Sequence, residues 1–373
     1  RSVVSDCVQG LARCLAAITD DVVRREAILR ALFAVYRADV ELGGIGLGET
    51  APDVILEHAT PEERQMVANW VRDALPSGTS WSDDYHRQVY GAFLLALEQD
   101  TLDDETYLRI CRETGRVHDL VDRLLALGRV DEAAKEAERV ADYPLLGLAD
   151  VFVRHGQADI AERLMADRIL NTRDTRLLAW LKDHREARGD AGGALDLVER
   201  IFALHPNLGS YREARRIARQ AGRWEATRPK LLDLVEAHKL GSLLVEVYLD
   251  EGEMDLALAQ VKRLLASSGR PAGYPYVGDN VSGLGDSVAL KAAQAAEETR
   301  PREALEIYRE YAERLIALRG RGNYQEACHL LAKVRTLHER LGEPEVWTRY
   351  VAELRERTRS LRALKEELAA AGL

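Results

Sequence analysis

The chain has 373 residues, of which 46% are hydrophobic, 31% charged and 6% aromatic. Its formal net charge of −10 argues against wholesale binding of nucleic acid, because phosphate neutralisation requires a basic surface. No apolar run approaches the roughly 18 residues of a transmembrane helix, so no membrane association is expected. Alanine, leucine, arginine and glutamate dominate throughout, which favours helix over strand. The composition predicts an all-α protein.

Residues 1–105 predict an irregular helical region. Two helices are expected within residues 1–42, with a break near residues 19–21. Farther along, Thr60 and Glu63 have the spacing of a capping box, in which each residue satisfies a free backbone N–H of a helix start.

The stretch GGIGLGET, residues 43–50, has the glycine spacing of a phosphate-binding loop. Such a loop needs a lysine, and Glu49 stands in its place. Its carboxylate would repel a phosphate. The residues before it fit an amphipathic helix, whereas a phosphate-binding loop follows a buried strand. We therefore predict a connector between two helices, followed by a short helix from Pro52.

A short phrase, glycine followed five residues later by alanine, recurs along the chain. It reads GRVDEA from Gly128, GQADIA from Gly156, GDAGGA from Gly189, GEMDLA from Gly252 and GNYQEA from Gly322, with a shortened GRWEA from Gly222. The spacings between Gly128 and Gly252 are 28, 33, 33 and 30 residues, close to the ~34-residue tetratricopeptide period.

Each glycine is expected to end a helix in a left-handed cap, and each alanine to let the next helix approach closely. A single hairpin cannot bury its apolar stripe, so neighbouring hairpins must stack. Residues 106–266 therefore predict tetratricopeptide-like helical repeats, and the fold class expected is an α-solenoid.

The rest of the chain divides into two further sections. Residues 267–287 contain five glycines and two prolines and predict a loop. Residues 288–373 predict C-terminal helical repeats that end in one capping helix. One apolar stripe is expected on that helix: Val351, Leu354, Leu361, Leu364 and Leu368.

The cysteines and histidines fit no metal site or catalytic motif. Cys7, Cys14, Cys111 and Cys328 lack the close pairing of a zinc site, and we expect them to be buried apolar residues of a cytoplasmic protein. The sequence predicts no enzyme, no metal and no cofactor in this chain, and no small-molecule substrate is evident.

A basic stripe is the one candidate binding site. Ser210 and Glu213 have capping-box spacing and open a helix with five arginines on one side: Arg212, Arg215, Arg216, Arg219 and Arg223. The stripe is either a solvated face neutralised by acids of the adjacent hairpin or an anion-binding site for an acidic partner or a nucleic-acid backbone.

Long phrases at both ends also resemble a known family. They are LGGIGLGETAPDVILEHATPEERQMVANWVRDALP, YGAFLLALEQDTLDDETYLRICRETG, and the C-terminal run that begins AAEETRPREALEIYREYAERL and extends to Leu373. These resemble the helical-repeat region that lies after the zinc finger in bacterial SWIM zinc-finger proteins. The C-x-C…C-x-H zinc module of that family is absent here, since Cys7 and Cys14 make no C-x-C and Cys328 directly precedes His329. The resemblance implies a finger upstream of Arg1 or none.

The function predicted is a non-enzymatic scaffold or adaptor that binds another macromolecule through its solenoid surface, with a protein as the favoured partner. The alternative is a nucleic-acid-associated module of a SWIM zinc-finger protein, which would use the stripe at residues 212–223.

Overall fold

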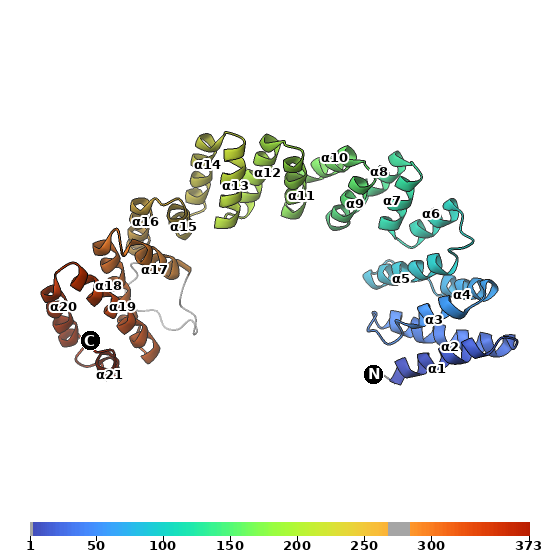
Figure 1. Ribbon diagram of the computed structural model, residues 1–373, viewed down its shortest axis with the longest axis horizontal. Coiled ribbons are helices and arrows are strands. Elements are labelled where there is room, and N and C mark those ends of the chain that lie inside the picture. Colours follow the sequence, from blue (N-terminus) through green and yellow to red (C-terminus); the bar gives the residue numbers. More distant parts are fainter. Residues whose placement is uncertain (1–2, 268–283) are drawn as a thin grey trace. The chain divides into compact units, whose positions relative to one another are not determined.

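The computed structural model describes residues 3–267 and 284–373, and within these ranges the regular structure consists of α-helices (Figure 1). The predicted all-α fold is confirmed. The predicted loop at 267–287 is wrong at both ends, because Ser267 is the last residue of one helix and Leu284 the first of the next. The rest of that loop lies outside the described residues.

The helices form two compact units that divide between Leu181 and Lys182. Unit 1 comprises α1 (Val3–Ala17), α2 (Val22–Glu41), α3 (Ala51–His58), α4 (Pro61–Asp73), α5 (Trp81–Leu97), α6 (Asp104–Glu113), α7 (Val117–Ala126), α8 (Val130–Glu138), α9 (Asp142–Arg154), α10 (Ala158–Ile169) and the start of α11 (Thr175–Ala187). Unit 2 comprises the end of α11, α12 (Ala191–Leu204), α13 (Leu208–Gln220), α14 (Trp224–Ala237), α15 (Gly241–Asp250), α16 (Met254–Ser267), α17 (Leu284–Ala296), α18 (Pro301–Leu318), α19 (Arg321–Arg340), α20 (Pro344–Arg357) and α21 (Arg362–Ala370). The division falls inside the segment 106–266, which we predicted as one section, and the other predicted section boundaries stay predictions.

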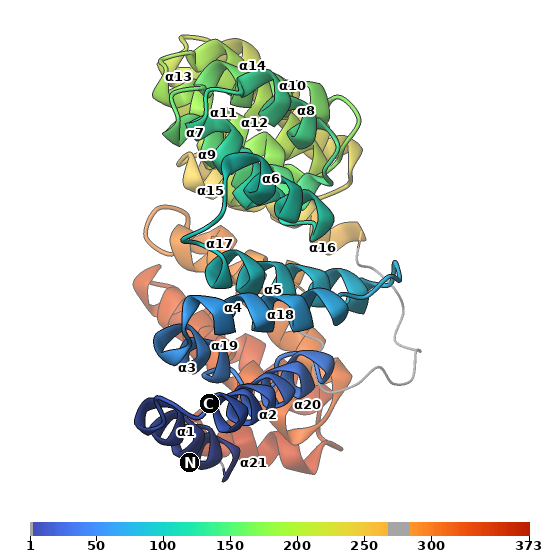
Figure 2. The ribbon, with the colours of Figure 1, turned by 90° about the vertical axis from the view of Figure 1, so that its right-hand side faces the viewer.

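The first five helices of unit 1 pack around one hydrophobic core. Apolar residues of each helix are buried in it, among them Leu15, Leu29, Ile55, Val67 and Leu94. Figure 2 shows α4 and α5 side by side, with α2 and then α1 toward the N-terminus. The Thr60 hydroxyl accepts from the Glu63 N–H, and the Glu63 carboxylate accepts from the Thr60 N–H, so the predicted capping box is confirmed.

A buried arginine joins the ends of several of these helices. Arg25 on α2 donates twice to the Glu63 carboxylate, from Nε at 2.8 Å and from Nη2 at 2.9 Å. It also donates to the carbonyl oxygens of Leu15, Ile18 and His58. One guanidinium thus satisfies chain ends of α1 and α3 and the first turn of α4, which holds these helices in register.

GGIGLGET connects α2 to α3, as predicted. Gly43, Gly44 and Gly46 have φ values of 86°, 73° and 81°, which are costly for any residue with a side chain. Gly48 is needed for close approach, because a Cβ there would lie 2.7 Å from the carbonyl oxygen of Val35 on α2.

The hairpins after this region use the repeated glycine as predicted. Five glycines of the phrase have positive φ: Gly128, Gly156, Gly189, Gly222 and Gly252. After α7, the Gly128 N–H donates to Leu125 at 3.0 Å and the Arg129 N–H donates to Leu124 at 2.8 Å, the two bonds of a Schellman cap. In unit 1, α7 packs on α8 and α9 on α10, while α7 also contacts α9 and α8 contacts α10. These stacked hairpins make the described repeats α-solenoid in character.

Three turns differ from the sequence pattern. The phrase at Gly222 is not shortened, since Thr227 occupies the buried position that alanine takes in the other hairpins. Gly322 lies inside α19, and the residues with positive φ before this helix are Arg319 and Gly320, at 60° and 93°. Between α14 and α15 the left-handed position belongs to Lys239, at φ 57°.

The C-terminal end of unit 2 holds two helices where we predicted one. α20 ends at Arg357 with Thr358 as its C-cap, and Arg362 starts α21, so the single capping helix is wrong. Its apolar residues nevertheless join one core: Leu354, Leu364 and Leu368 are buried, with Val351 and Leu361 partly buried beside them.

The cysteine prediction is half right. Cys111 and Cys328 are buried, whereas Cys7 and Cys14 are exposed on α1. Their spacing of seven residues puts them on one helix face but does not determine which face. Burial raises the pKa of the Cys111 thiol to about 12, which disfavours the thiolate at neutral pH.

Candidate functional site

The predicted arginine stripe lies on α13 and in the turn after it. Asn207 caps this helix: its Oδ1 accepts from the Ser210 N–H at 3.0 Å, and Ser210 Oγ accepts from the Asn207 N–H at 3.3 Å. The capping box is therefore Asn207 with Ser210, and the predicted pair of Ser210 with Glu213 is wrong. Because α13 ends at Gln220, Arg223 lies outside it, at the N-cap of α14.

The two faces of α13 differ in burial. Its inner face is fully buried: Tyr211, Ala214, Ile217 and Ala218. On its other side Arg212, Arg216 and Arg219 are exposed, and Arg215 is half-buried. The structure therefore brings four of the five predicted arginines together on one helix.

Two of these arginines bind the end of α15. Arg212 Nε donates to Asp250 Oδ1 and Arg215 Nη2 to Asp250 Oδ2, both at 2.7 Å. Arg215 also lies 3.9 Å from the Glu251 carboxylate. The hydrogen bond from Arg212 lowers the pKa of Asp250 despite the opposing effect of burial.

Arg216 binds acids on the other side of α13. Its Nη2 lies 2.9 Å from Glu186 Oε2 on α11 and 2.8 Å from Glu213 Oε1 on α13. Glu213 also accepts from Lys182 Nζ at 2.8 Å. Hydrogen bonds, chiefly from Arg216 and then from Lys182, lower the pKa of Glu213 to about 2 although burial opposes the shift.

The last two arginines are held more loosely. Arg219 lies over the Trp224 ring, 5.8 Å from its centroid, and has no carboxylate within 4.0 Å in the part of the chain that the structure describes. Arg223 reaches Asp196 at 3.4 Å, where both side chains are exposed.

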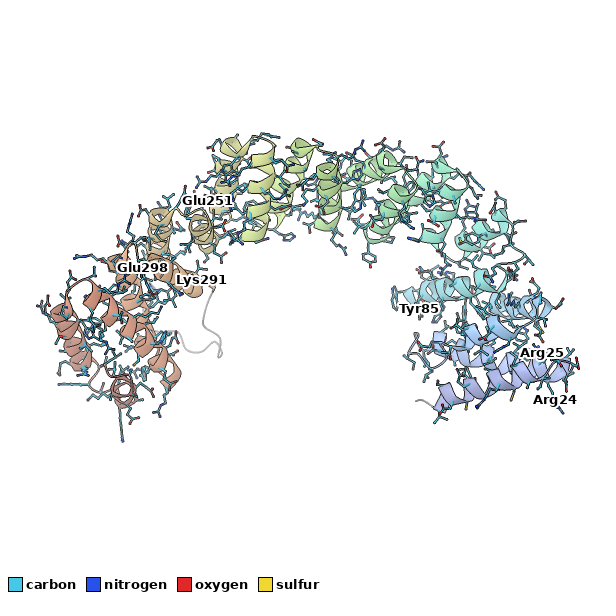
Figure 3. The ribbon with its side chains drawn as sticks, viewed as in Figure 1. Arg24, Arg25, Tyr85, Glu251, Lys291 and Glu298 are labelled. Carbon is cyan, nitrogen blue, oxygen red and sulfur yellow. The ribbon has the colours of Figure 1, made fainter. Side chains whose placement is uncertain are left out.

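Glu251, at the C-cap of α15, is the centre of this charge network. It accepts from the Tyr211 hydroxyl at 2.8 Å and from Arg228 Nε and Nη2 at 2.9 and 2.7 Å. Arg228 also donates to Glu253 at 2.6 Å. Figure 3 labels Glu251 near the helix ends of this part of unit 2.

The arrangement forms a row of alternating charge over α11, α13 and the end of α15, which alternate with α12 and α14 along the chain. We name it the mixed-charge face: Glu186, Arg212, Arg216, Arg219, Asp250 and Glu251. A phosphate backbone would have to displace carboxylates from Arg212, Arg215 and Arg216, which costs the ion pairs already formed. The face is better suited to a surface that carries both signs of charge. The anion-binding role of Arg212, Arg215, Arg216, Arg219 and Arg223 stays a prediction.

For Arg212, Arg215 and Arg216 the structure matches the first alternative predicted for the stripe, a face neutralised by acids of the adjacent hairpins, but sequence reasoning did not identify which acids. Glu186 lies 30 residues before Arg216 and Asp250 lies 38 residues after Arg212, so each partner is about one repeat away. Counting acids at one repeat spacing from the stripe would have pointed to them.

The described residues contain neither a cluster of metal-ligating side chains nor a helix suited to span a membrane. No three or more His, Cys, Asp or Glu side chains in residues 3–267 and 284–373 lie close enough to hold a metal ion together. In the same ranges, no helix combines the length and apolarity required to cross a membrane.

Comparisons with known proteins identify few relatives. No family model matches the chain. A stretch of 95 residues, 26% of the chain, is 34% identical to the uncharacterized protein YwqB of Bacillus subtilis (strain 168), and it spans 17% of that protein's length.

Two solved structures are similar at low TM-scores. The TPR domain of P58(IPK) has a TM-score of 0.18 at 13% identity, with 99% of this chain and 92% of that one covered. A circular tandem repeat protein has a TM-score of 0.15 at 17% identity, with 99% and 79% covered. Scores this low carry no argument, and the fold rests on the helices of this chain and their packing.

Proposed function

We propose that the chain is a non-enzymatic scaffold that binds another protein through the exposed faces of its helical hairpins. The observation that carries this proposal is the mixed-charge face of unit 2. Arg212 and Arg216 on this face are paired with acids of neighbouring helices, which restrains both side chains before any partner arrives. A preorganised surface loses less side-chain entropy on binding than a loose one.

A protein partner fits this face better than nucleic acid. Complementary pairs of both signs set orientation and suppress wrong partners at protein interfaces. Phosphate binding requires cations in excess, and on this face only Arg219 lacks a carboxylate within salt-bridge distance, counting the described residues.

We also propose that the chain belongs among the helical-repeat regions of SWIM zinc-finger proteins. The proposal is supported by the three long sequence phrases that resemble that family. If the chain belongs to that family, residues 212–223 could associate with nucleic acid. This is the alternative against which the protein-binding proposal is tested.

The test combines capture with direct binding. The tagged chain is used to isolate proteins from its native cells, and each captured protein is purified and titrated against the chain by calorimetry. We expect saturable 1:1 binding that weakens about tenfold when Arg212 and Arg216 are both changed to Glu. The matched control carries two Lys→Glu changes outside the mixed-charge face, at Lys230 and Lys262.

Mobility-shift experiments at several salt concentrations test the alternative. A shift with double-stranded DNA that is lost in the Arg215→Glu, Arg216→Glu, Arg219→Glu variant would favour the nucleic-acid role. ATP turnover above the blank would contradict the non-enzymatic part of the proposal.

A further inference from the structure

A second surface, in unit 1, has the features of a peptide-binding groove. It lies along α5, between α3 and the turn before α7, with a volume of about 440 Å³. Its apolar lining residues are Tyr36, Pro52, Leu56, Val89, Ala92 and Phe93. The lining runs from Tyr85 to Ala96 on α5, which at 1.5 Å per residue is ~16 Å, or about three helical turns.

The floor of this groove is fixed in place. The Tyr36 hydroxyl donates to the carbonyl oxygen of Val89 at 3.3 Å. The Tyr36 ring meets Phe93 and Tyr90 edge to face, with centroids 5.1 and 6.0 Å apart. Because these rings lock one another, the groove exists before a ligand binds.

Apolar surface continues beyond the N-terminal end of α5. Trp81 is 84% exposed and stacks on Tyr85, which itself lines the groove. The Tyr85 hydroxyl lies against Gly44 of the GGIGLGET connector, whose neighbour Ile45 is 63% exposed. Figure 3 labels Tyr85 at the N-terminal end of α5. Large exposed side chains beside a groove are typical of interaction sites.

The α3 side of the groove is acidic. Asp53 lines the groove, and Glu49 and Glu57, four residues before and after it, are also exposed, the first just before α3 and the second near its end. Within the described part of the chain, none of the three forms an ion pair with Lys or Arg, and Glu57 approaches only His58, at 3.9 Å.

The opposite wall carries one arginine, Arg116, which is already paired with a carboxylate of this chain. Arg116 pairs with Asp119 and donates to the carbonyl oxygen of Gln88 at 2.9 Å. The charge that a ligand meets in the groove is therefore negative, in contrast to the balanced mixed-charge face of unit 2.

From this geometry we infer that the groove binds an amphipathic helix of a partner protein. The apolar face of that helix packs on Leu56, Val89 and Ala92, over the buried Tyr36 and Phe93 rings. Its Lys or Arg residues face Glu49, Asp53 and Glu57. A helix fits because the apolar strip has the length of three turns and lies parallel to α5. The inference rests on the proposed function, since it assigns a partner chemistry to the scaffold.

Fluorescence anisotropy with the full chain tests the inference. The probe is a labelled helical peptide of about three turns with Leu at positions i, i+3, i+4 and i+7 and Lys elsewhere, and a second probe has Glu in place of Lys. We expect the Lys probe to bind at least about tenfold more tightly than the Glu probe.

A matched pair of variants locates the binding site. Ala92 is exposed on the groove floor, and Ala92→Arg should weaken binding of the Lys probe by about tenfold or more by filling the groove and adding a positive charge. Ala126→Arg makes the same charge change at an exposed position near the end of α7 and should leave binding within about twofold. Circular dichroism confirms that both variants are folded.

A second pair isolates the acidic wall. Asp53→Asn should weaken binding of the Lys probe about threefold, whereas Asp20→Asn, at an exposed position before α2, should not. Equal effects of Ala92→Arg and Ala126→Arg would overturn the inference, and so would self-association of the chain that Ala92→Arg abolishes. Anionic lipid vesicles that bind more tightly than the probe would do the same.

The outcome can be separated from that of the proposed function. If the Ala92→Arg chain still captures its partners and the probe binds no better than its Glu version, the groove is wrong and the scaffold stands. If no partner binds the chain directly while the probe shows the expected pattern, the scaffold proposal fails and the groove stands.

Discussion

A buried arginine in unit 1, Arg25, and a buried glutamate in unit 2, Glu251, each gather partners from several elements, but their charges are opposite; Figure 3 labels both residues. Each of the two side chains is 9% exposed. Arg25 donates hydrogen bonds to one carboxylate and to three carbonyl oxygens. Glu251 forms ion pairs with two arginines and accepts a hydrogen bond from a tyrosine hydroxyl.

The two residues differ in the ion pairs that their partners would keep if Arg25 or Glu251 were removed. Glu63 has Arg25 as its one ion-pair partner among the described residues. Arg215 and Arg228 each have a second carboxylate, Asp250 and Glu253. A buried charge without a partner is far more costly than a weakened pair. Whether the partners have a second residue of opposite charge, rather than how deeply Arg25 or Glu251 is buried, should therefore decide how much each of the two contributes to stability.

The largest expected effect is the loss of Arg25. Arg25→Ala leaves Glu63 without its cation and three carbonyl groups without a donor, so the free energy of unfolding should fall by about 3–5 kcal/mol. Urea unfolding measures the change, and hydrogen exchange should show lost protection in α1 to α4.

The control is the neighbouring arginine. Arg24 is 76% exposed and pairs only with Asp21 in the described part of the chain, so Arg24→Ala should cost less than about 0.5 kcal/mol. Similar losses for Arg24→Ala and Arg25→Ala would show that the buried network is not what joins these helices.

The second effect tests redundancy at Glu251. Glu251→Gln keeps a hydrogen-bond acceptor for Tyr211, and both arginines keep another acid, so we expect a loss of about 1–2 kcal/mol. Hydrogen exchange in α13 to α15 reports it. Glu253→Gln, at a more exposed partner of Arg228, should cost less than about 0.5 kcal/mol. A loss at Glu251 as large as that at Arg25 would mean that the second carboxylates do not compensate.

The sequence predicted what local chemistry determines. The turns at Gly128 and Gly156 result from the left-handed cap that glycine adopts cheaply, and the capping box at Thr60 results from its spacing. The left-handed turn at Lys239 was not predicted, because a lysine in the sequence does not indicate a positive φ. The turn was predicted at Gly322, but Arg319 and Gly320 just before it adopt the positive φ values.

Features that depend on distant residues could not be predicted in the same way. The arginine positions on α13 were predicted, but the acids that pair with them come from about one repeat away on either side. Arg25 gave no signal at all, because three of its acceptors are backbone carbonyls at helix ends. The groove along α5 likewise depends on how α2, α3 and α5 meet, which periodicity does not specify.

The smallest expected effect is the loss of stability of unit 2 at low pH, to which Glu213 contributes. Glu213 has a folded-state pKa of about 2, below its usual value near 4.5, so its contribution is full above the usual value and is lost as pH falls toward 2. Side-chain exposure of 34% limits this contribution to less than about 1 kcal/mol. Urea unfolding of unit 2, followed by hydrogen exchange in α13 at pH 6 and pH 3, should therefore show a smaller loss in Glu213→Gln than in the parent chain. An equal loss in both would place the acid sensitivity of unit 2 elsewhere, with Asp250 and Glu186 the next groups to test, because arginine hydrogen bonds lower the pKa of each.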